Sequence, residues 1–343
     1  MAYQTNSITI PRHLRRERRD RTLRSEPPRP WLENPSHLHQ ILDHVRGGRL
    51  PLKYAYAGSA AFTHDALAQT AGYAEVIGDA RHEATTLIHA QPDGLPDQIV
   101  EVGPGNGAHT AALFDVAEQP GAAPAAQRRR YLGLDFSRTL LKFAAQTLAA
   151  RTDLDVSTAH WDLEDGPTPR IEAWRRGSRP VLACLLGHTL GNLEEPGQAL
   201  RNLALSLRPG DTLLVSLTLY RPDSGADSIL DPYRTETFTA AVLEPLRAVA
   251  AADSAFRLKL RLVGRTVIGD AELTQPVSAA DREPIGHTTV RCFASARFLL
   301  EEALSLFSPP AGWEVRHWST DEDGAHLAIV AQRRDLRGGR RHG

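Results

Sequence analysis

The sequence predicts a doubly wound α/β fold, with a mainly parallel sheet, a terminal antiparallel hairpin and a smaller additional lobe. Three observations predict this fold. Strand-like and helical segments alternate between residues 98 and 217. A glycine-rich turn, 103–107, directly follows the first strand, and a second turn, 321–324, separates two strand-like segments near the C-terminus. Such an alternation places helices on both faces of a parallel sheet.

The expected strands are short and apolar, and the helices that flank them each have one apolar face. The strands are 98–102, 131–135, 154–157, 181–186 and 212–217, followed by the hairpin strands 313–318 and 327–331. The helices are 79–90, 108–116, 137–150 and 196–207. The strand 181–186 contains no polar residue, which indicates burial on both faces. Ser137 is a suitable N-cap for the helix that it begins.

The segments outside this alternation are expected to form the lobe. Residues 220–291 contain a helical stretch, 235–251, and a strand-like stretch, 257–267. The N-terminal residues are rich in Arg and Pro and poor in apolar side chains, which is typical of a flexible arm. The expected division is an arm at 1–35, a substrate lobe at 36–72 and 220–291, a sheet domain at 73–219 and 292–334, and a basic tail at 335–343.

The composition excludes several classes of protein. The 343 residues include 40 basic and 41 acidic ones, and this balance disfavours a dedicated nucleic-acid binder. Cys184 and Cys292 are too few for a disulfide framework, and both lie in apolar surroundings. No apolar run approaches the roughly 20 residues of a membrane span, and no secretory signal follows Met1. We expect a cytoplasmic protein, monomeric or weakly dimeric, that binds neither nucleic acid nor membrane.

The glycine-rich turn carries the strongest local signal for a ligand. Glycines between a strand and a helix let backbone N–H groups approach a ligand closely. A dinucleotide-binding turn has the spacing Gly-x-Gly-x-x-Gly. Here Gly103, Gly105 and Gly107 are spaced Gly-x-Gly-x-Gly, and Glu101 stands two residues before the first of them. This version suits a ligand without phosphate, whose amino-acid tail carries an ammonium group that Glu101 can help to hold.

Two aspartates follow the next two strands. Asp135 ends the second strand, where it can accept hydrogen bonds from both hydroxyls of a ribose. It lies 28 residues after Gly107, further than the roughly 20 expected, because 118–130 adds a polar loop. Asp162 follows the third strand and can accept from the exocyclic amine of adenine, beside an apolar wall at Leu163. A helix N-cap is the alternative role for either aspartate.

The segment from Gly187 to Asn192 begins where the fourth strand ends. In a methyltransferase this is where the acceptor meets the sulfonium of the cofactor. Asn192 offers both a donor and an acceptor, which suits the carboxylate or amine of a small polar substrate. His188 could act as a general base or could cap the local backbone. Together with the terminal hairpin, these features predict a Rossmann-like class I methyltransferase with S-adenosyl-L-methionine (SAM) as its cofactor and Gly187 on the cofactor side.

These segments resemble the histidine-specific methyltransferases, the histidine Nα-methyltransferase family of ergothioneine biosynthesis. The resemblance runs from about residue 50 to residue 332. It rests on Leu52–Tyr56 with Gly58, Ser59 and Phe62, on Glu101–Gly107, on Gly187–Asn192, on Leu207–Asp211 and on Trp318–Glu322. It implies a Rossmann-like methyltransferase domain and a substrate lobe formed by the N-terminal part and an insertion. It also implies that Tyr56 and Gly103 contact the cofactor, with Asp135 at the ribose and Asp162 at the adenine.

On the acceptor side, the resemblance implies that Tyr73 and Asn192 face an amino acid and serve catalysis, with Asn192 holding the α-amino and carboxylate groups. The chain departs from the family in two places. The family tyrosine expected before Asp231 is replaced by the pair 229–230, and Tyr233 could substitute for it. The glutamate and serine that read the imidazole are absent from 287–291. Histidine is therefore not the expected substrate, and in that segment His287 or Arg291 could read a different side chain.

The expected reaction is N-methylation of an amino acid or an amino-acid-derived small molecule in specialised metabolite biosynthesis. A sulfonium donor needs no acid, so the enzyme chiefly aligns the donor with the acceptor and excludes water. The proton of the amine would pass to water, or to a tyrosine or histidine near Asn192. No metal is expected, because the histidines do not cluster at ligand spacing. Three alternatives remain open: an O- or C-methyltransferase, a nicotinamide oxidoreductase, and a non-catalytic SAM-binding protein.

Overall fold

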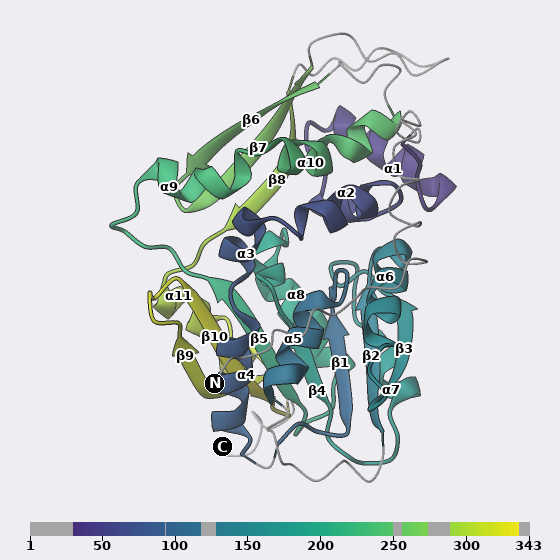
Figure 1. Ribbon diagram of the computed structural model, residues 1–343, viewed down its shortest axis with the longest axis vertical. Coiled ribbons are helices and arrows are strands. Elements are labelled where there is room, and N and C mark those ends of the chain that lie inside the picture. The colour runs from purple at the N-terminus through teal and green to yellow at the C-terminus, as the bar shows by residue number, and fades with distance from the viewer. Residues whose placement is uncertain (1–29, 93, 118–127, 250–255, 274–288, 336–343) are drawn as a thin grey trace, which may run out of the picture.

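The computed structural model describes residues 30–92, 94–117, 128–249, 256–273 and 289–335. Its larger part is built on a seven-stranded sheet with the order β3-β2-β1-β4-β5-β10-β9 (Figure 1). The strands are β1 (Gln98–Val102), β2 (Arg129–Asp135), β3 (Leu154–His160), β4 (Leu182–Leu185), β5 (Thr212–Thr218), β9 (Trp313–Thr320) and β10 (His326–Arg333).

The first five strands run parallel to one another, and the last two form an antiparallel pair. β1 pairs in parallel with both β2 and β4, and the pairs β2–β3 and β4–β5 are also parallel. β10 runs antiparallel between β5 and β9. The strand order reverses between β1 and β4, and such a switch point opens a crevice at the carboxyl ends of the strands. The predicted doubly wound sheet with a terminal antiparallel hairpin is therefore confirmed.

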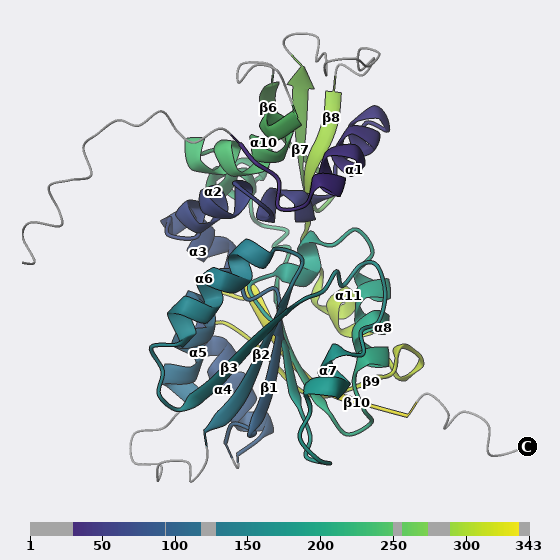
Figure 2. The ribbon, with the colours of Figure 1, turned by 90° about the vertical axis from the view of Figure 1, so that its right-hand side faces the viewer.

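Helices cover both faces of this sheet (Figure 2). One face carries α4 (Ala80–Ala90), α5 (Ala108–Ala117) and α6 (Arg138–Leu148), and the other carries α7 (Arg170–Trp174), α8 (Pro196–Ser206) and α11 (Leu300–Ser305), with η6 (Pro309–Ala311) beside it. Each face of the sheet has its own hydrophobic core, and β1 contributes to both because successive residues of a strand point to opposite faces. Ile99 packs with α4, α5 and α6, and Val100 packs with α7, α8 and α11. The Ser137 hydroxyl accepts the N–H of Leu140 at 3.1 Å, which confirms the predicted cap of α6.

A smaller lobe lies over the carboxyl edge of the sheet, at the top of Figure 1. It contains an antiparallel sheet in the order β6-β7-β8 and its own hydrophobic core. Its strands are β6 (Phe256–Val263), β7 (Thr266–Leu273) and β8 (Thr289–Ala296), and its helices are α1 (Pro35–Arg46), η2 (Leu52–Tyr56), α2 (Ala60–Leu67), α3 (Ala71–Ile77), α9 (Ala226–Leu230), η4 (Asp231–Tyr233) and α10 (Glu236–Val249). Within the described ranges, no helix has the length and apolar character needed to cross a bilayer.

Two details of the lobe differ from the sequence-based expectations. The stretch 257–267, expected as strand-like around Gly264, forms two strands that reverse at this glycine, whose φ is 59°. The lobe boundary expected after residue 291 falls inside β8, because the pairing of β8 with β7 continues to Ala296. The last strand of the lobe thus runs directly into the sheet domain.

The segment 30–34, which belongs to the expected flexible arm 1–35, is anchored in the structure. The backbone N–H of Trp31 donates to Ser59 Oγ at 3.0 Å. The Glu33 carboxylate accepts from the backbone N–H groups of Arg138 and Thr139 at 2.9 and 2.7 Å. An acidic group is favoured there, because these are the first N–H groups of α6. Residues 1–29 of the arm and 336–343 of the tail lie outside the described residues.

Candidate functional site

The carboxyl ends of β1–β4 open into a hollow of about 810 Å³, which we call the sheet-edge cleft. Residues of η2, α2 and α3 in the lobe close it from above. Nine of the predicted site residues line it together: Tyr56, Tyr73, Gly103, Gly105, Asp135, Asp162, Leu163, Gly187 and Asn192.

The turn after β1 has a left-handed backbone at all three glycines, with φ values of 73°, 57° and 79° at Gly103, Gly105 and Gly107. A Cβ atom on Gly105 would meet nothing within 4 Å, so this glycine borders open space. A Cβ atom on Gly107 would lie 3.0 Å from the Cα of Ala144 in α6. Gly107 was predicted to bind the cofactor, but it does not line the sheet-edge cleft and instead permits close packing of α5 on α6.

Glu101 is buried on β1 and lies outside the sheet-edge cleft. Its Oε2 accepts hydrogen bonds from the hydroxyls of Thr110 at 2.6 Å and Tyr131 at 2.7 Å. Burial raises the pKa of this carboxyl group. Glu101 lines an adjoining cavity that shares Gly103 and Gly105 with the cleft. From this cavity it could meet the ammonium group of a ligand that lies across the glycine turn.

Asp135 ends β2 and lines the sheet-edge cleft. Its Oδ1 accepts the backbone N–H of Ser137 at 2.7 Å. Burial raises the pKa of Asp135 to about 7. The N-cap of α6 is Ser137, so Asp135 does not fill the alternative role of helix cap. Hydroxyl donors stabilise a buried carboxylate, and the two hydroxyls of a ribose could supply them.

Asp162 also lines the cleft, and the sequence analysis missed its partner, Lys53. The Lys53 Nζ lies 2.6 Å from Asp162 Oδ2 and 3.8 Å from Glu164 Oε2. The backbone N–H of Glu164 donates to the other oxygen, Asp162 Oδ1, at 3.1 Å. A carboxylate has about four acceptor sites, so Asp162 can accept a further donor such as an adenine amine. Leu163 and Phe136 line the cleft beside it.

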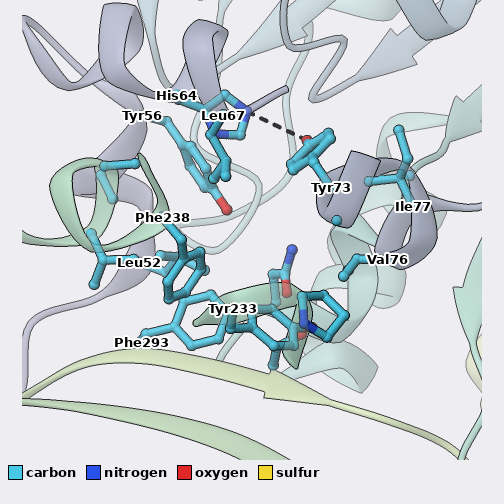
Figure 3. A pocket seen from close by; sticks show the side chains of 18 residues that line it. Leu52, Tyr56, His64, Leu67, Tyr73, Val76, Ile77, Tyr233, Phe238 and Phe293 are labelled. Carbon is cyan, nitrogen blue, oxygen red and sulfur yellow. Dashed lines mark hydrogen bonds between the residues drawn. The ribbon is translucent and has the colours of Figure 1, made fainter. Parts of the chain in front are cut away.

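A second hollow of about 580 Å³, which we call the lobe cavity, lies under the lobe sheet (Figure 3). Its walls are mostly apolar, and they include Leu52, Ala55, Leu67, Val76, Ile77, Pro232, Phe238, Ala241, Val242 and Phe293. Five residues line both this cavity and the sheet-edge cleft, namely Tyr56, His64, Tyr73, Gly187 and Asn192. The two hollows therefore meet at these five residues.

Asn192 ends η3 (Thr189–Asn192) at this junction. Its Oδ1 is buried and has no hydrogen-bond partner among the described residues. Leaving a buried acceptor unpaired costs about 1–3 kcal/mol, so this atom is suited to a donor on a ligand. Tyr233 lines the lobe cavity as well. The structure thus brings together three of the residues predicted to bind substrate, Tyr73, Asn192 and Tyr233.

The sequence analysis also missed His64, which lines both hollows from α2. Its Nε2 lies 3.5 Å from the Tyr73 hydroxyl, as the dashed line in Figure 3 shows, and its ring packs edge-to-face with Tyr56 at 4.7 Å between centroids. Burial lowers the pKa of His64 to about 4 and raises that of Tyr73 to about 12. Both groups are therefore neutral around pH 7. No spacing rule in the sequence connects His64 to Tyr73, so only the fold identifies this pair.

The His188 side chain bonds to the backbone of β5 rather than to the local backbone, so it does not fill the capping role that the sequence left open. Its Nδ1 accepts the backbone N–H of Thr218 at 2.9 Å, and its backbone is left-handed with a φ of 64°. Burial lowers the pKa of His188 to about 3. It lines neither the cleft nor the lobe cavity, so it is not placed to act as a base on a substrate there.

Arg291 does not line the lobe cavity, although it was predicted to bind substrate. It borders a neighbouring hollow next to Arg49, and its Nε lies 3.9 Å from Asp270 Oδ1. The reason is that the pairing of β7 with β8 shifts register beside Asp270. Arg291 therefore does not share the face of β8 from which Phe293 and Ser295 line the lobe cavity. His287, the other residue predicted for this role, lies outside the described residues.

One protein family and several solved structures match this chain. The profile of the histidine-specific, SAM-dependent methyltransferases matches residues 68–242. No curated protein matches the chain. Among solved structures, a methyltransferase from Streptomyces caelestis is 16% identical with a TM-score of 0.41, over 79% of this chain and 96% of that one. The 1,6-didemethyltoxoflavin-N1-methyltransferase of Burkholderia thailandensis is 13% identical with a TM-score of 0.41, over 83% and 92% of the two chains.

Proposed function

Because the chain belongs to the family of histidine-specific, SAM-dependent methyltransferases, we propose that it methylates the amino group of an amino acid or an amino-acid-derived small molecule other than histidine. One observation carries this proposal. The sheet-edge cleft and the lobe cavity meet at Asn192, whose buried Oδ1 has no partner among the described residues. A methyl donor in the cleft and an acceptor in the cavity would face each other at this point.

The residues of the cleft fit the cofactor. Gly105 borders open space, so a ligand can approach the backbone of the turn. Asp135 offers a buried carboxylate for the ribose hydroxyls, and Asp162 offers a half-buried carboxylate for the adenine amine beside Leu163. When bound there, SAM supplies an electrophilic methyl group on a sulfonium. Glu101 would face the ammonium group of its amino-acid tail from the adjoining cavity.

On the acceptor side, Asn192 would hold both ends of an amino-acid head group. Its Oδ1 would accept from the amine, and its amide N–H would donate to the carboxylate. The Tyr73 hydroxyl can donate to His64 Nε2, and its oxygen then remains free to accept a second N–H of the amine. Three fixed contacts of this kind would hold the nitrogen lone pair in line with the methyl group.

The amine must lose its proton before it can attack, and water is the acceptor that best fits the site. His64 has a pKa of about 4, so it is a weak base, and it serves instead to orient the Tyr73 hydroxyl. The pKa of Tyr73, about 12, likewise keeps its hydroxyl protonated at neutral pH. The mechanism is therefore one of positioning and exclusion of water, in which the neutral amine enters from solvent.

The proposal is tested by incubating the purified full-length chain with SAM and a mixture of natural amino acids and their amines, and by analysing the products by mass spectrometry. We expect a product about 14 Da heavier than one substrate, and fragmentation should place the added methyl group on the amino nitrogen. A methyl group on an oxygen or a carbon would overturn the N-methylation proposal while leaving the family assignment intact. Methylation of histidine in preference to all other amino acids would overturn the exclusion of histidine.

A further inference from the structure

We propose that the substrate carries an uncharged aromatic side chain, which packs in the lobe cavity against a cluster formed by Tyr233, Phe238 and Phe293. This inference rests on the proposed function, because it takes the lobe cavity as the acceptor site. It adds the chemical class of the side chain, which the family assignment does not supply for this chain. We call these three rings the aromatic cluster.

The aromatic cluster forms one wall of the lobe cavity. Phe238 and Phe293 pack edge-to-face with their centroids 4.9 Å apart and an interplanar angle of 89°. Tyr233 lies 5.2 Å from Phe238 and 5.4 Å from Phe293. Figure 3 shows the three rings gathered on one side of the cavity, across from Tyr73. An aromatic ligand can continue such a cluster, because edge-to-face and offset pairs are favourable at these distances.

The remaining walls disfavour a charged side chain. Among the described residues that line the lobe cavity, none is an Asp, Glu, Lys or Arg. A charge that enters this space would lose its water without gaining a counter-charge from the lining residues, and such burial is strongly unfavourable. His64 lies at the junction with the sheet-edge cleft and is neutral around pH 7 because burial lowers its pKa to about 4. The cavity therefore selects an uncharged side chain.

Two hydroxyl groups give the cavity a small polar region next to the aromatic cluster. Tyr233 and Ser295 both line the cavity, the Ser295 Oγ has no hydrogen-bond partner among the described residues, and the guanidinium of Arg297 lies near the Tyr233 hydroxyl. Burial raises the pKa of Tyr233, so this hydroxyl stays neutral. A neutral hydroxyl can pair with an indole N–H or a phenol of an aromatic substrate. The nearby Arg297 adds a reason why a cationic side chain would bind poorly there.

The test compares amino acids of similar size on the unmodified full-length chain, with SAM present at saturation. The probes are phenylalanine, tyrosine and tryptophan, against leucine, histidine, lysine and glutamate. We expect at least one aromatic probe to exceed every charged probe and histidine by about 100-fold in kcat/KM. A preference for leucine, histidine or a charged amino acid would overturn the inference while leaving amino-acid N-methylation intact. No methylation of any amino acid, with SAM still bound, would instead overturn the proposed function itself.

The variant Phe293→Glu sharpens the test, because it adds a carboxylate to the aromatic cluster. We expect kcat/KM for the best aromatic probe to fall by about 100-fold and the ratio of histidine or lysine to that probe to rise. Leu205→Glu is the matched control, because it adds the same charge at an exposed position on α8, 53% accessible. It should leave both values within about twofold. An unchanged preference in Phe293→Glu would overturn the inference.

A milder substitution keeps the test usable if Phe293→Glu does not fold. Phe293→Leu retains an apolar side chain but removes the ring. We expect kcat/KM for the best aromatic probe to fall by about 3- to 10-fold relative to that for leucine, as for the loss of one aromatic pair. A ratio that does not change would show that Phe293 makes no ring contact with the substrate, which contradicts the inference.

Discussion

The two hollows differ in the kind of groups that line them. The sheet-edge cleft carries the carboxylates of Asp135, Asp162 and Glu164 and the ammonium group of Lys53. The described walls of the lobe cavity carry only neutral polar groups, chiefly hydroxyls and the amide of Asn192. We therefore expect the cleft to hold a highly polar ligand by hydrogen bonds, and the cavity to exclude charge and to select its ligand by shape. The junction between them has to satisfy both requirements.

The largest effect is expected at this junction, from Asn192→Ala. The substitution removes both the proposed acceptor for the amine and the proposed donor for the carboxylate, so kcat/KM for the best amino acid should fall by about 100-fold or more. The affinity for S-adenosylhomocysteine, measured by calorimetry, should change by less than about threefold, because most contacts of the cleft remain. An equal loss in both measurements would show that Asn192 serves the cleft rather than the junction.

The second-largest effect is expected from a substitution in the sheet-edge cleft that leaves the lobe cavity unchanged. Asp135→Asn keeps the size of the side chain but removes the charged acceptor, so the Kd for S-adenosylhomocysteine should rise by about 10- to 50-fold. At saturating SAM, kcat should remain near that of the unmodified enzyme, because Asp135 does not line the lobe cavity. A lower kcat at saturation with an unchanged Kd would contradict the assignment of Asp135 to the ribose.

The raised pKa of Asp135, about 7, predicts that ligand binding in the sheet-edge cleft depends on pH, whereas binding in the lobe cavity should not. Ionisation of this group as the pH rises from 6 to 8 should increase the affinity for S-adenosylhomocysteine by about tenfold. Without ligand, the contribution of Asp135 to the free energy of unfolding changes with pH in the opposite direction. The folded state retains this proton between about pH 4 and pH 7 while the unfolded state has lost it, so the contribution of Asp135 to the free energy of unfolding falls over that interval. Both trends should weaken in Asp135→Asn.

A smaller effect is expected from His64→Leu, because His64 acts through Tyr73. Loss of the acceptor for the Tyr73 hydroxyl should lower kcat by about 5- to 10-fold and leave the pH profile of kcat/KM unchanged. His64→Gln, whose amide can accept the same hydrogen bond, should recover most of the activity. If His64→Leu shifts the acidic limb of the profile, then His64 takes up the proton and the positioning role is wrong.

The sequence predicted the cleft better than the cavity for a physical reason. Gly103, Gly105 and Asp135 lie at the ends of consecutive strands, and a parallel sheet brings all such ends to one edge. The order of residues along the chain therefore encodes their proximity. Tertiary packing of α2, α10 and β8 brings together His64, Phe238 and Phe293. In the sequence, no pattern distinguishes any of the three from an ordinary core residue.

The smallest effect is expected at Arg291, which was predicted to bind substrate but does not line the lobe cavity. Arg291 was predicted to read the substrate side chain, but the irregular pairing beside Asp270 turns it toward the neighbouring hollow. Arg291→Gln should therefore change kcat/KM for every amino acid by less than about twofold, since a surface substitution away from a site costs little. Phe293→Leu, two positions along β8, is the matched comparison and should alter the ranking of substrates. If Arg291→Gln changes that ranking instead, selection extends beyond the lobe cavity into the hollow next to Arg49, and the contrast between a charged cleft and a neutral cavity no longer describes how this chain chooses its acceptor.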